Sequence, residues 1–557
     1  MTASPEKPAN AAIFYASDGY SPATKGINGR RVAGESFLKG FLRHADVDEF
    51  VLLAKGSAEA TEVAALHAAL RPNIPLRAVG LVRPAKIAPL RSMYYPAANI
   101  AGEAWRRADL GTDAWTISGI THTTSTMGIM QGFFDLRMAP VMDWDAVICT
   151  SRAVQASVLA QNALIDDHIR AHFHCPPPTP PMFPVIPLGV HCADFAPDPA
   201  ARAALRQTIG AAPDDVIFST IARLTPHEKF DPLPIYLAMQ AAQRQLPPGI
   251  KLHVVFCGIF RQPYSKAVFT QGAARLMPDV GFHLLDGALA ADRKAALSAA
   301  DVFLFMIDNI QETFGLAPLE GMAAGLPLLV SDWDGMKDTV TPDIGLRVKT
   351  RMLGPRHLAN ESLRLQGGID DYAQYCAAVS AMTEVDMPDL TQRILDLAIN
   401  PDLRRRMGAA ARARVRSHYD WSAVIPQFQA LWAEQTARRI AGAARARRIA
   451  GHNLPIAPSP TLLYGSYPSE TAVFPARLYA RDLTHRAALR ETLALRNYTA
   501  MNRQFAPTEQ IEAVLAVITA GGAAGATVAE IVQATRLTEM FVDRVLMWLL
   551  KYDFIRR

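Results

Sequence analysis

Two carboxylates, Glu312 and Glu320, stand eight positions apart, where an apolar run is followed by a loop and a short helical pattern. Pro318 falls near the first turn of that pattern and Gly325 just past its end, which are positions that proline and glycine favour in helices. The pattern predicts a helix of about two turns, with Glu312 in the loop before it and Glu320 on it. Carboxylates placed in this way can accept hydrogen bonds from hydroxyl groups on two parts of one ligand.

The backbone at Phe314, Gly315 and Leu316 forms the expected start of this helix. The first amide groups of a helix have no partners within the helix, and the helix dipole places positive potential at the same end. A phosphate group or a developing oxyanion is stabilised there. We therefore expect these amides to face a cleft that binds an anionic group.

The elements that position these residues follow a repeating strand and helix pattern, which is typical of parallel sheets covered by helices. The first half predicts a helix over Val32–Arg43 and strands at Ala12–Ala16, Phe50–Ala54, Trp115–Ser118 and Asp145–Thr150. The second half predicts strands at Val216–Ile221, Leu252–Cys257, Phe282–Leu285, Val302–Met306 and Leu328–Ser331. Seven prolines within residues 176–187 exclude a helix there and mark a domain boundary. Because ligands of such sheets bind beyond the carboxyl ends of the strands, we expect the site between two domains.

The segment from Glu312 to Glu320, with Phe-Gly-Leu between them, resembles the E-x7-E motif of the retaining glycosyltransferases of family 4, which have the two-domain GT-B fold. Ile221–Leu233 is similar to the Gly-Arg-Leu…Lys-Gly stretch of that family, and Ile186–Pro197 to its interdomain segment. The resemblance covers roughly residues 10–435. The chain departs from the family pattern at Leu188, His191 and Phe230, at the single glycine after Asn28, and at Asp332–Gly335, which replaces a Gly-Gly segment.

The resemblance implies that Arg223 and Lys229 neutralise the diphosphate of a nucleotide sugar. It also implies that Glu320 accepts hydrogen bonds from the ribose of that nucleotide, and that Glu312 holds hydroxyl groups of the transferred sugar. The departure of the diphosphate is the main electrostatic problem of such a reaction, and cations address it directly.

The resemblance extends to residues of the first domain. The resemblance implies that His122 approaches the sugar from the first domain and that the loop at Asn28 and Gly29 closes over the phosphate and the acceptor.

Retention of the sugar's anomeric configuration in this family is attributed to front-face attack without a covalent intermediate, so positioning and leaving-group stabilisation replace a nucleophile.

Two Asp-x-Asp triplets, Asp143/Asp145 and Asp332/Asp334, raise the alternative of a metal-dependent glycosyltransferase. Asp143 and Asp145 begin an expected strand, and the layout supplies cationic side chains and a helix end for the diphosphate. We therefore favour a reaction that needs no metal and no cofactor besides the nucleotide sugar as co-substrate.

The net charge of +5 is unevenly distributed, because residues 437–506 contain eleven basic and three acidic residues, a net charge of +8. This basic connector, with arginines at 438, 439, 445, 447 and 448, is a candidate for contact with anionic lipid and equally for a solvated helix. The lack of a secretion-signal layout and of Cys-x-x-Cys pairs predicts a cytoplasmic protein. The lipid alternative for the connector corresponds to peripheral contact at the inner membrane surface.

The last 51 residues predict helices at Glu509–Ile518, Val528–Ala534 and Glu539–Leu550 with a terminal strand, an order that resembles a winged helix-turn-helix. The expected recognition helix presents Glu539 and Asp543, and the unit has a net charge of −1, which opposes attraction to nucleic-acid phosphates. We therefore favour a module that binds a protein partner, and we consider nucleic-acid binding the weaker interpretation.

At 557 residues the chain is long enough for several domains, and its composition excludes a mostly disordered protein. The predicted domains are an acceptor-side Rossmann-like domain at 1–183, a donor-side Rossmann-like domain at 184–415, a helix crossing back at 416–436, the connector at 437–506 and the winged-helix-like module at 507–557. We predict an α/β GT-B enzyme, a retaining glycosyltransferase that uses a hydroxyl acceptor on a saccharide, a lipid-linked glycan or a protein. The alternative is a non-catalytic sugar-nucleotide sensor that regulates a DNA- or protein-binding tail, and donor turnover distinguishes the two.

Overall fold

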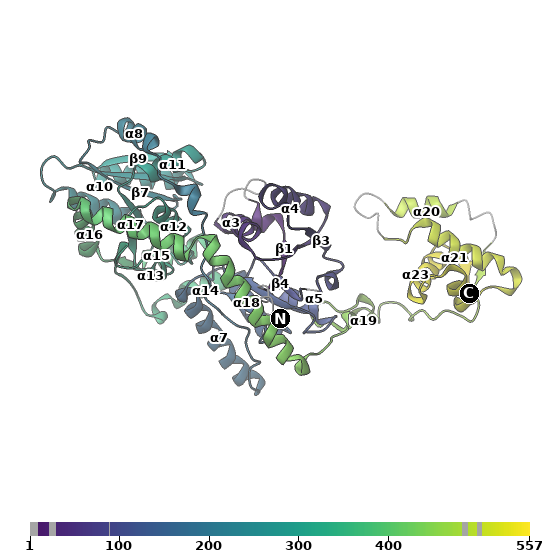
Figure 1. Ribbon diagram of the computed structural model, residues 1–557. Coiled ribbons are helices and arrows are strands. Elements are labelled where there is room, and N and C mark those ends of the chain that lie inside the picture. The colour runs from purple at the N-terminus through teal and green to yellow at the C-terminus, as the bar shows by residue number, and fades with distance from the viewer. Residues whose placement is uncertain (1–8, 22–28, 89, 482–487, 498–503) are drawn as a thin grey trace, which may run out of the picture. The chain divides into compact units, whose positions relative to one another are not determined.

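The computed structural model describes residues 9–21, 29–88, 90–481, 488–497 and 504–557 (Figure 1). Its contacts divide the chain into a unit of residues 1–457 and a unit of residues 458–557. The larger unit has two lobes, each built on a six-stranded parallel sheet, and the smaller unit is mostly helical. The expected α/β class with two doubly wound sheets, the architecture of the GT-B fold, is confirmed.

The sheet of the first lobe has the strand order β3-β2-β1-β4-β5-β6, and all of its neighbours are parallel. In this doubly wound order, successive strands are added toward one edge up to β3 and toward the other edge from β4 onward. The switch point between β1 and β4 is where ligands of such sheets bind. The strands are β1 (Ala12–Tyr15), β2 (Phe50–Ala54), β3 (Leu76–Gly80), β4 (Ser92–Tyr94), β5 (Thr116–Ile120) and β6 (Ala146–Ile148).

The sheet of the second lobe repeats this topology with the order β12-β11-β10-β7-β8-β9. Its switch point lies between β10 and β7. The strands are β7 (Val216–Arg223), β8 (Leu252–Ile259), β9 (Gly281–Asp286), β10 (Val302–Phe305), β11 (Leu328–Ser331) and β12 (Gly345–Val348), and a separate antiparallel pair is formed by β13 (Thr350–Met352) and β14 (Thr383–Val385).

All nine strands predicted from the sequence are present, with ends shifted by up to two residues, and three further strands complete the main sheets. Two of the three, β3 and β12, are edge strands, each with an arginine and with residues only partly buried. The third, β4, has only three residues. Edge strands and very short strands lack the long apolar pattern on which prediction depends.

Helices cover the sheets of both lobes (Figure 1). Those of the first lobe are α1 (Ser17–Tyr20), α3 (Gly29–His44), α4 (Ser57–Leu70), α5 (Ala101–Ala108), α6 (Met127–Met138) and α7 (Arg152–Phe173). Those of the second lobe are α8 (Pro199–Thr208), α9 (Leu233–Gln243), α10 (Pro263–Leu276), α11 (Ala290–Ala299), α12 (Leu316–Ala323), α13 (Met336–Thr339), α14 (Ala359–Gln366), α15 (Tyr372–Ala381), α16 (Met387–Ile399) and α17 (Pro401–His418).

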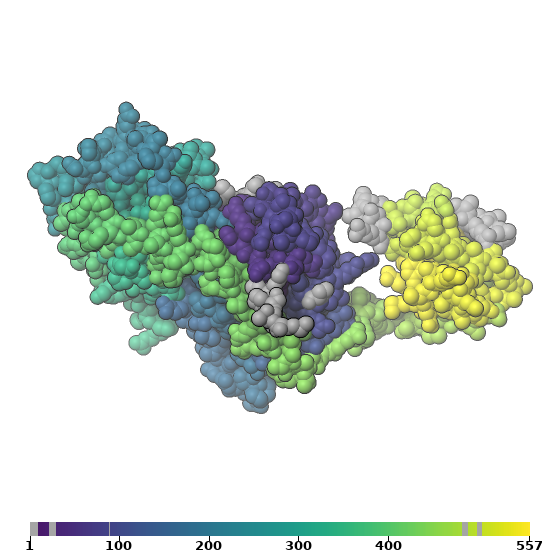
Figure 2. Space-filling view, in the orientation of Figure 1, coloured from purple at the N-terminus to yellow at the C-terminus, as the bar shows by residue number. Residues whose placement is uncertain are grey.

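Helix α18 (Trp421–Ala441) returns from the second lobe and packs on α3 of the first. Its Trp421 Nε1 donates to Ser36 Oγ at 2.7 Å, and its Trp432 Nε1 donates to Ser118 Oγ at 3.0 Å. A Cβ atom on Gly40 of α3 would lie 2.5 Å from the indole of Trp421, so only glycine allows this approach. Figure 2 shows α17 and α18 in green across one face of both lobes. These contacts join the lobes at the side where the chain crosses between them.

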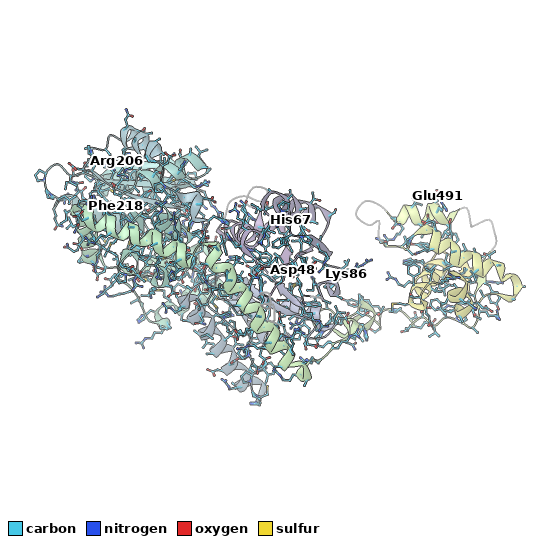
Figure 3. The ribbon with its side chains drawn as sticks, in the orientation of Figure 1. Asp48, His67, Lys86, Arg206, Phe218 and Glu491 are labelled. Atoms are coloured by element: carbon cyan, nitrogen blue, oxygen red, sulfur yellow. The ribbon has the colours of Figure 1, made fainter. Side chains whose placement is uncertain are left out.

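Buried and partly buried residues of the second lobe hold together the amino-terminal ends of two of its strands, which lie at the far end of the sheet from the candidate site. Phe218, labelled in Figure 3, lies fully buried in β7. Arg206, also labelled there, donates to Asp301 Oδ2 at 3.1 Å, and Asp301 precedes β10. The starts of β7 and β10 are therefore held together, since the Ile217 amide also donates to Asp301 Oδ2 at 2.9 Å.

The smaller unit contains the three helices predicted near the C-terminus, as α21 (Thr508–Ala520), α22 (Val528–Thr535) and α23 (Glu539–Lys551). It also contains α19 (Pro460–Leu463), α20 (Ala488–Arg496) and an antiparallel pair of β15 (Tyr479–Ala480) with β16 (Ile555–Arg556). Leu478 and Leu489 are buried in the core of this unit together with residues of α21 and α23. The core of the unit thus includes residues that precede Pro507.

Within the part of the chain that the structure describes, the helices are all too short or too polar to cross a lipid bilayer.

Candidate active site between the lobes

The predicted donor-side residues meet at the switch point of the second sheet. Arg223 is the last residue of β7, and Glu312 lies in the loop that follows β10. These two strands are adjacent and parallel, so their carboxyl ends open onto the same edge. The position is the one at which doubly wound sheets bind ligands, independently of any motif.

Lys229 and Glu312 form an ion pair in this loop region. The second carboxylate oxygen of Glu312 accepts the Gly315 amide at 3.0 Å, and the Lys229 ammonium lies 5.2 Å from the centre of the Phe305 ring. Burial raises the pKa of Glu312, but Lys229 and the amides of Gly315 and Phe314 outweigh burial and hold that pKa below its usual value. Glu312 is therefore ionised at neutral pH.

Arg223 binds two side chains of the same site. Its guanidinium donates to Glu228 Oε2 at 2.8 Å and to the side-chain oxygen of Gln311. Further bonds join the two loops, since Asn309 Nδ2 donates to the His227 carbonyl at 3.0 Å. The loop after β7 and the loop after β10 are thus connected at several points, which fixes the spacing of the two cations.

Glu320 lies on α12, and its carboxylate has no hydrogen-bond or ion-pair partner among the described residues. Burial raises the pKa of Glu320 to about 7, and the charge of Arg293 only partly opposes this effect. A carboxyl group in this state is available to a ligand and changes its charge near neutral pH.

The start of α12 differs from the expectation in one respect. Gly315 has a left-handed backbone, with φ of +85°, and its amide is bound by Glu312 and is not open to the cleft. The expectation of an exposed Gly315 amide is therefore wrong, because the motif supplies its own carboxylate as the cap. Phe314 is buried near Tyr419, and Leu316 is the first residue of the helix.

His122 faces this loop from the first lobe. It follows β5, and its carbonyl accepts the Thr313 hydroxyl at 3.0 Å, so it lies beside the neighbour of Glu312. Burial and the positive charge of Arg30 lower the pKa of His122 to about 4. A hydrogen bond to the Pro96 carbonyl raises this pKa but is the smaller effect. The imidazole is therefore neutral at pH 7 and can exchange hydrogen bonds with hydroxyl groups.

Gly29 is the exposed first residue of α3, and Asn28 lies outside the described residues. Burial raises the pKa of Tyr94, the last residue of β4, and the positive charge of Arg30 partly opposes this effect. Arg30, the residue after Gly29, is therefore close to the switch point of the first sheet. The first lobe therefore presents a guanidinium and an imidazole on the side that faces Glu312.

The first Asp-x-Asp triplet has structural partners. Asp145 is fully buried, and its two oxygens accept from the Arg107 guanidinium at 2.6 and 2.7 Å. Asp143 accepts from Arg445 at 2.9 Å.

The second triplet, which replaces a Gly-Gly segment of the family pattern, connects the two lobes. Ser151 Oγ of the first lobe donates to Asp334 Oδ1 at 3.0 Å. Within the second lobe, Trp333 Nε1 donates to the Asn309 carbonyl at 3.1 Å. Burial raises the pKa of Asp334 to about 7, and the nearby charge of Glu312 adds to this effect. A search of the described residues for three or more neighbouring histidine, cysteine or acidic side chains in a metal-binding arrangement found none.

The arginines of the basic connector at 445, 447 and 448 contact the first lobe, in the segment that follows α18. Arg445 binds Asp143, Arg448 Nε donates to the Asp109 carbonyl, and the Arg447 amide donates to Thr112 Oγ1 at 3.1 Å. Arg438 is paired with Glu434, and Arg439 is buried. Part of the positive charge that suggested lipid contact is therefore already engaged by the protein.

A cavity of about 510 Å³ lies where the lobes and the interdomain segment meet. Of the predicted site residues only Phe314 lines it, together with residues of both lobes such as Arg152 and Asp338. This cavity is distinct from the cluster of Arg223, Lys229 and Glu312.

Four residues of the site were not anticipated. Glu228 and Gln311 bind Arg223, Thr313 binds His122, and Arg30 acts on His122. Glu228 and Gln311 are sequence neighbours of the predicted residues Lys229 and Glu312. Their polar character next to these residues is the signal from which they could have been predicted. The contact between Thr313 and His122 joins residues 191 positions apart, and no local pattern indicates it.

Comparison with known proteins gives a family match within the second lobe. Residues 201–361 match the family model described as "Glycosyl transferases group 1". A GDP-mannose-dependent monoacylated alpha-(1-6)-phosphatidylinositol monomannoside mannosyltransferase of Corynebacterium glutamicum is 24% identical over 249 residues, which are 43% of this chain and 53% of that protein. The chain thus spans about half the length of this curated relative.

Two solved structures are among those to which the chain is similar. Anabaena HepE in complex with UDP has a TM-score of 0.48 and 15% identity, and the match covers 76% of this chain and 100% of that one. Sucrose-phosphate synthase of Thermosynechococcus elongatus has a TM-score of 0.46 and 16% identity, and the match covers 77% of this chain and 99% of that one. Residues 201–361, which contain Arg223, Lys229, Glu312 and Glu320, are similar to the group 1 glycosyl transferases.

Proposed function

We propose that the protein is a retaining, metal-independent glycosyltransferase that moves a sugar from a nucleotide diphosphate sugar to a hydroxyl acceptor. The observation that carries the proposal is the convergence of Arg223, Lys229 and Glu312 at the switch point of the second sheet, with His122 of the first lobe beside them. Two cations and a sugar-binding carboxylate are the groups that the departure of a diphosphate from a sugar requires.

The diphosphate binds to Arg223 and Lys229 in this proposal. In the structure both cations pair with carboxylates, Arg223 with Glu228 and Lys229 with Glu312. A diphosphate carries two negative charges and more acceptor oxygens than a carboxylate, so it competes for both cations. When the sugar–phosphate bond breaks, the same two side chains stabilise the charge that accumulates on the leaving group.

The sugar lies between Glu312 and His122. Ionised Glu312 accepts hydrogen bonds from sugar hydroxyls, and neutral His122 donates or accepts one from the opposite lobe. Glu320 accepts hydrogen bonds from the ribose. The acceptor hydroxyl attacks the sugar carbon on the face from which the diphosphate leaves, and its proton passes to the departing phosphate oxygen. Catalysis therefore rests on positioning and on stabilisation of the leaving group and needs no protein nucleophile or cofactor.

The donor nucleotide is best identified by a binding screen. The corynebacterial relative is named for GDP-mannose, and HepE was crystallised with UDP, so GDP, UDP and ADP are the first compounds to test. A ligand that binds only the folded protein raises its melting temperature. The corresponding nucleotide sugars then test turnover, and release of nucleoside diphosphate that disappears in Glu312→Ala and Arg223→Ala supports the proposal. Binding without any turnover would favour a non-catalytic sugar-nucleotide sensor.

The acceptor is a saccharide, a lipid-linked glycan or a protein hydroxyl in this proposal. The C-terminal unit serves as a module for a protein partner, because its last helix, α23, exposes Met540, which follows acidic Glu539, and Met547. Exposed methionines suit adaptable apolar contacts, whereas phosphate binding requires clustered basic residues. We place the protein in the cytoplasm.

A further inference from the structure

Thr313 stands between Glu312 and Phe314 and is bound to the opposite lobe on two sides. Its hydroxyl donates to the His122 carbonyl at 3.0 Å, and its carbonyl accepts the Thr150 hydroxyl at 3.3 Å. Its exposed fraction is 6%. A single residue of the second lobe thus contacts the ends of two strands of the first lobe.

The receiving edge of the first lobe is itself held together. His122 and Thr150 follow the neighbouring strands β5 and β6. Between them, Thr121 Oγ1 donates to the Ile148 carbonyl at 3.2 Å and accepts the Thr150 amide at 3.3 Å. The two partners of Thr313 therefore move as one body when the lobes move.

Glu312, in contrast, is bound entirely within the second lobe, by Lys229 and by the Gly315 amide. The side chain of Glu312 is therefore attached to the second lobe, whereas Thr313, the next residue, is attached to the first lobe. When the lobes separate, both bonds of Thr313 break, and the backbone next to the Glu312 carboxylate loses its external support.

We propose that Thr313 is a positioning residue that couples closure of the two lobes to the orientation of Glu312. This role rests on the proposed glycosyltransferase function, in which Glu312 holds the transferred sugar. Glu312 reaches its productive orientation only when the first lobe, which carries His122, is seated against the second lobe. Coupling of this kind prevents breakage of the donor before both lobes surround it.

Other contacts between the lobes provide a matched control. Tyr372 Oη lies 2.8 Å from Ser125 Oγ, and this bond joins the lobes without touching the loop of Glu312. Tyr372→Phe and Thr313→Val each remove one hydroxyl from the interface between the lobes. A difference between the two variants therefore reports the position of the hydroxyl and not merely the loss of one lobe contact.

The experiment compares the full chain with Thr313→Val, Thr313→Ser and Tyr372→Phe. We expect Thr313→Val to lower kcat about tenfold or more, with the donor Kd changed less than about threefold, because misorientation of a reacting group affects the transition state more than binding. Thr313→Ser keeps the hydroxyl and should stay within about threefold of the parent kcat, as should Tyr372→Phe. Thr313→Val with unchanged kcat, or equal losses in Thr313→Val and Tyr372→Phe, would overturn the coupling.

Hydrogen exchange gives a second readout that does not depend on turnover. In Thr313→Val the peptide covering residues 306–316 should exchange faster than in the parent, because the Gly315 amide is protected by Glu312. If the parent consumes no nucleotide sugar, the proposed function fails, while unchanged exchange in Thr313→Val would still overturn the coupling. If Thr313→Val does not fold, Thr150→Val removes the bond at the Thr313 carbonyl and is measured in the same way, with the same expected acceleration.

Discussion

The guanidinium of Arg223 binds the carboxylate of Glu228 at 2.8 Å, five residues further along the chain. Both side chains are about one-fifth to one-quarter exposed. The cation proposed to hold the diphosphate is therefore paired with an internal anion. Donor binding must exchange one anion for another at Arg223.

Glu228→Gln should strengthen donor binding. The substitution keeps the shape of the side chain and removes the charge that competes for Arg223, and a partly exposed ion pair of this kind contributes up to about 1 kcal/mol. We expect the donor Kd to fall by up to about fivefold in isothermal titration calorimetry. Weaker binding would instead mean that Glu228 orients Arg223 for the donor.

Arg223→Ala and Lys229→Ala should each lower kcat/KM for the donor. By analogy with the removal of an oxyanion donor, we expect a loss of about 2–4 kcal/mol of transition-state stabilisation, or roughly 30-fold to 1,000-fold. Arg351→Ala is the control, because Arg351 pairs with exposed Glu384 on β14 and is not part of the site. Unchanged kinetics in both site variants would remove the diphosphate site from the proposal.

Donor affinity should increase with pH around neutrality. Burial raises the pKa of Glu320 to about 7, so the group is largely protonated at pH 6 and ionised at pH 8. Ribose hydroxyls donate to the ionised form, so donor binding favours loss of the proton. We expect up to about tenfold tighter binding of the nucleotide sugar at pH 8 than at pH 6.

Glu320→Gln provides the comparison for this pH dependence. The amide does not titrate, so the Kd of the variant should stay nearly constant across the same range. A nucleotide diphosphate sugar has no phosphate monoester that titrates near pH 6, so the ligand itself adds no slope. A parent profile that is flat, or one that the variant reproduces, would contradict the role of Glu320 at the ribose.

Asp145→Ala should destabilise the protein strongly. Asp145 and Arg107 are both fully buried, and removal of one partner leaves an uncompensated charge in the core. Such a loss costs about 3–5 kcal/mol in the free energy of unfolding. Asp143→Ala is the matched control in the same triplet, because the partner of Asp143, Arg445, is 55% exposed, and this pair should contribute less than about 1 kcal/mol. Equal effects in chemical denaturation would contradict the assignment of Asp145 as a structural residue.

The main architecture was predictable from the sequence because strands and helices have local signals, and local motifs also led to the proposed donor-side residues. Apolar strands such as β2 and β11 were predicted with their observed ends, and proline and glycine indicated the short helix that begins at Leu316. The edge strand β3 was missed because it is only partly buried.

Interactions between distant residues had no such signal. Ser151 and Asp334 are 183 residues apart, and Thr313 and His122 are 191 apart, so their contacts depend on how two separate sheets meet. The Gly315 amide was expected to be open because the sequence does not reveal that the Glu312 side chain turns back toward its own helix. Local chemistry was thus predictable from residue types, whereas the internal partners of each charged group were not.

The most direct test is a crystal structure of the protein with the nucleoside diphosphate that stabilises it most in a thermal screen. We predict that the diphosphate lies between the lobes, with its oxygens within about 3 Å of the Arg223 guanidinium and the Lys229 ammonium. The pairing of Arg223 with Glu228 should be broken in that complex. A diphosphate bound elsewhere, for example in the cavity beside Arg152, with both ion pairs of the site intact, would contradict the central claim.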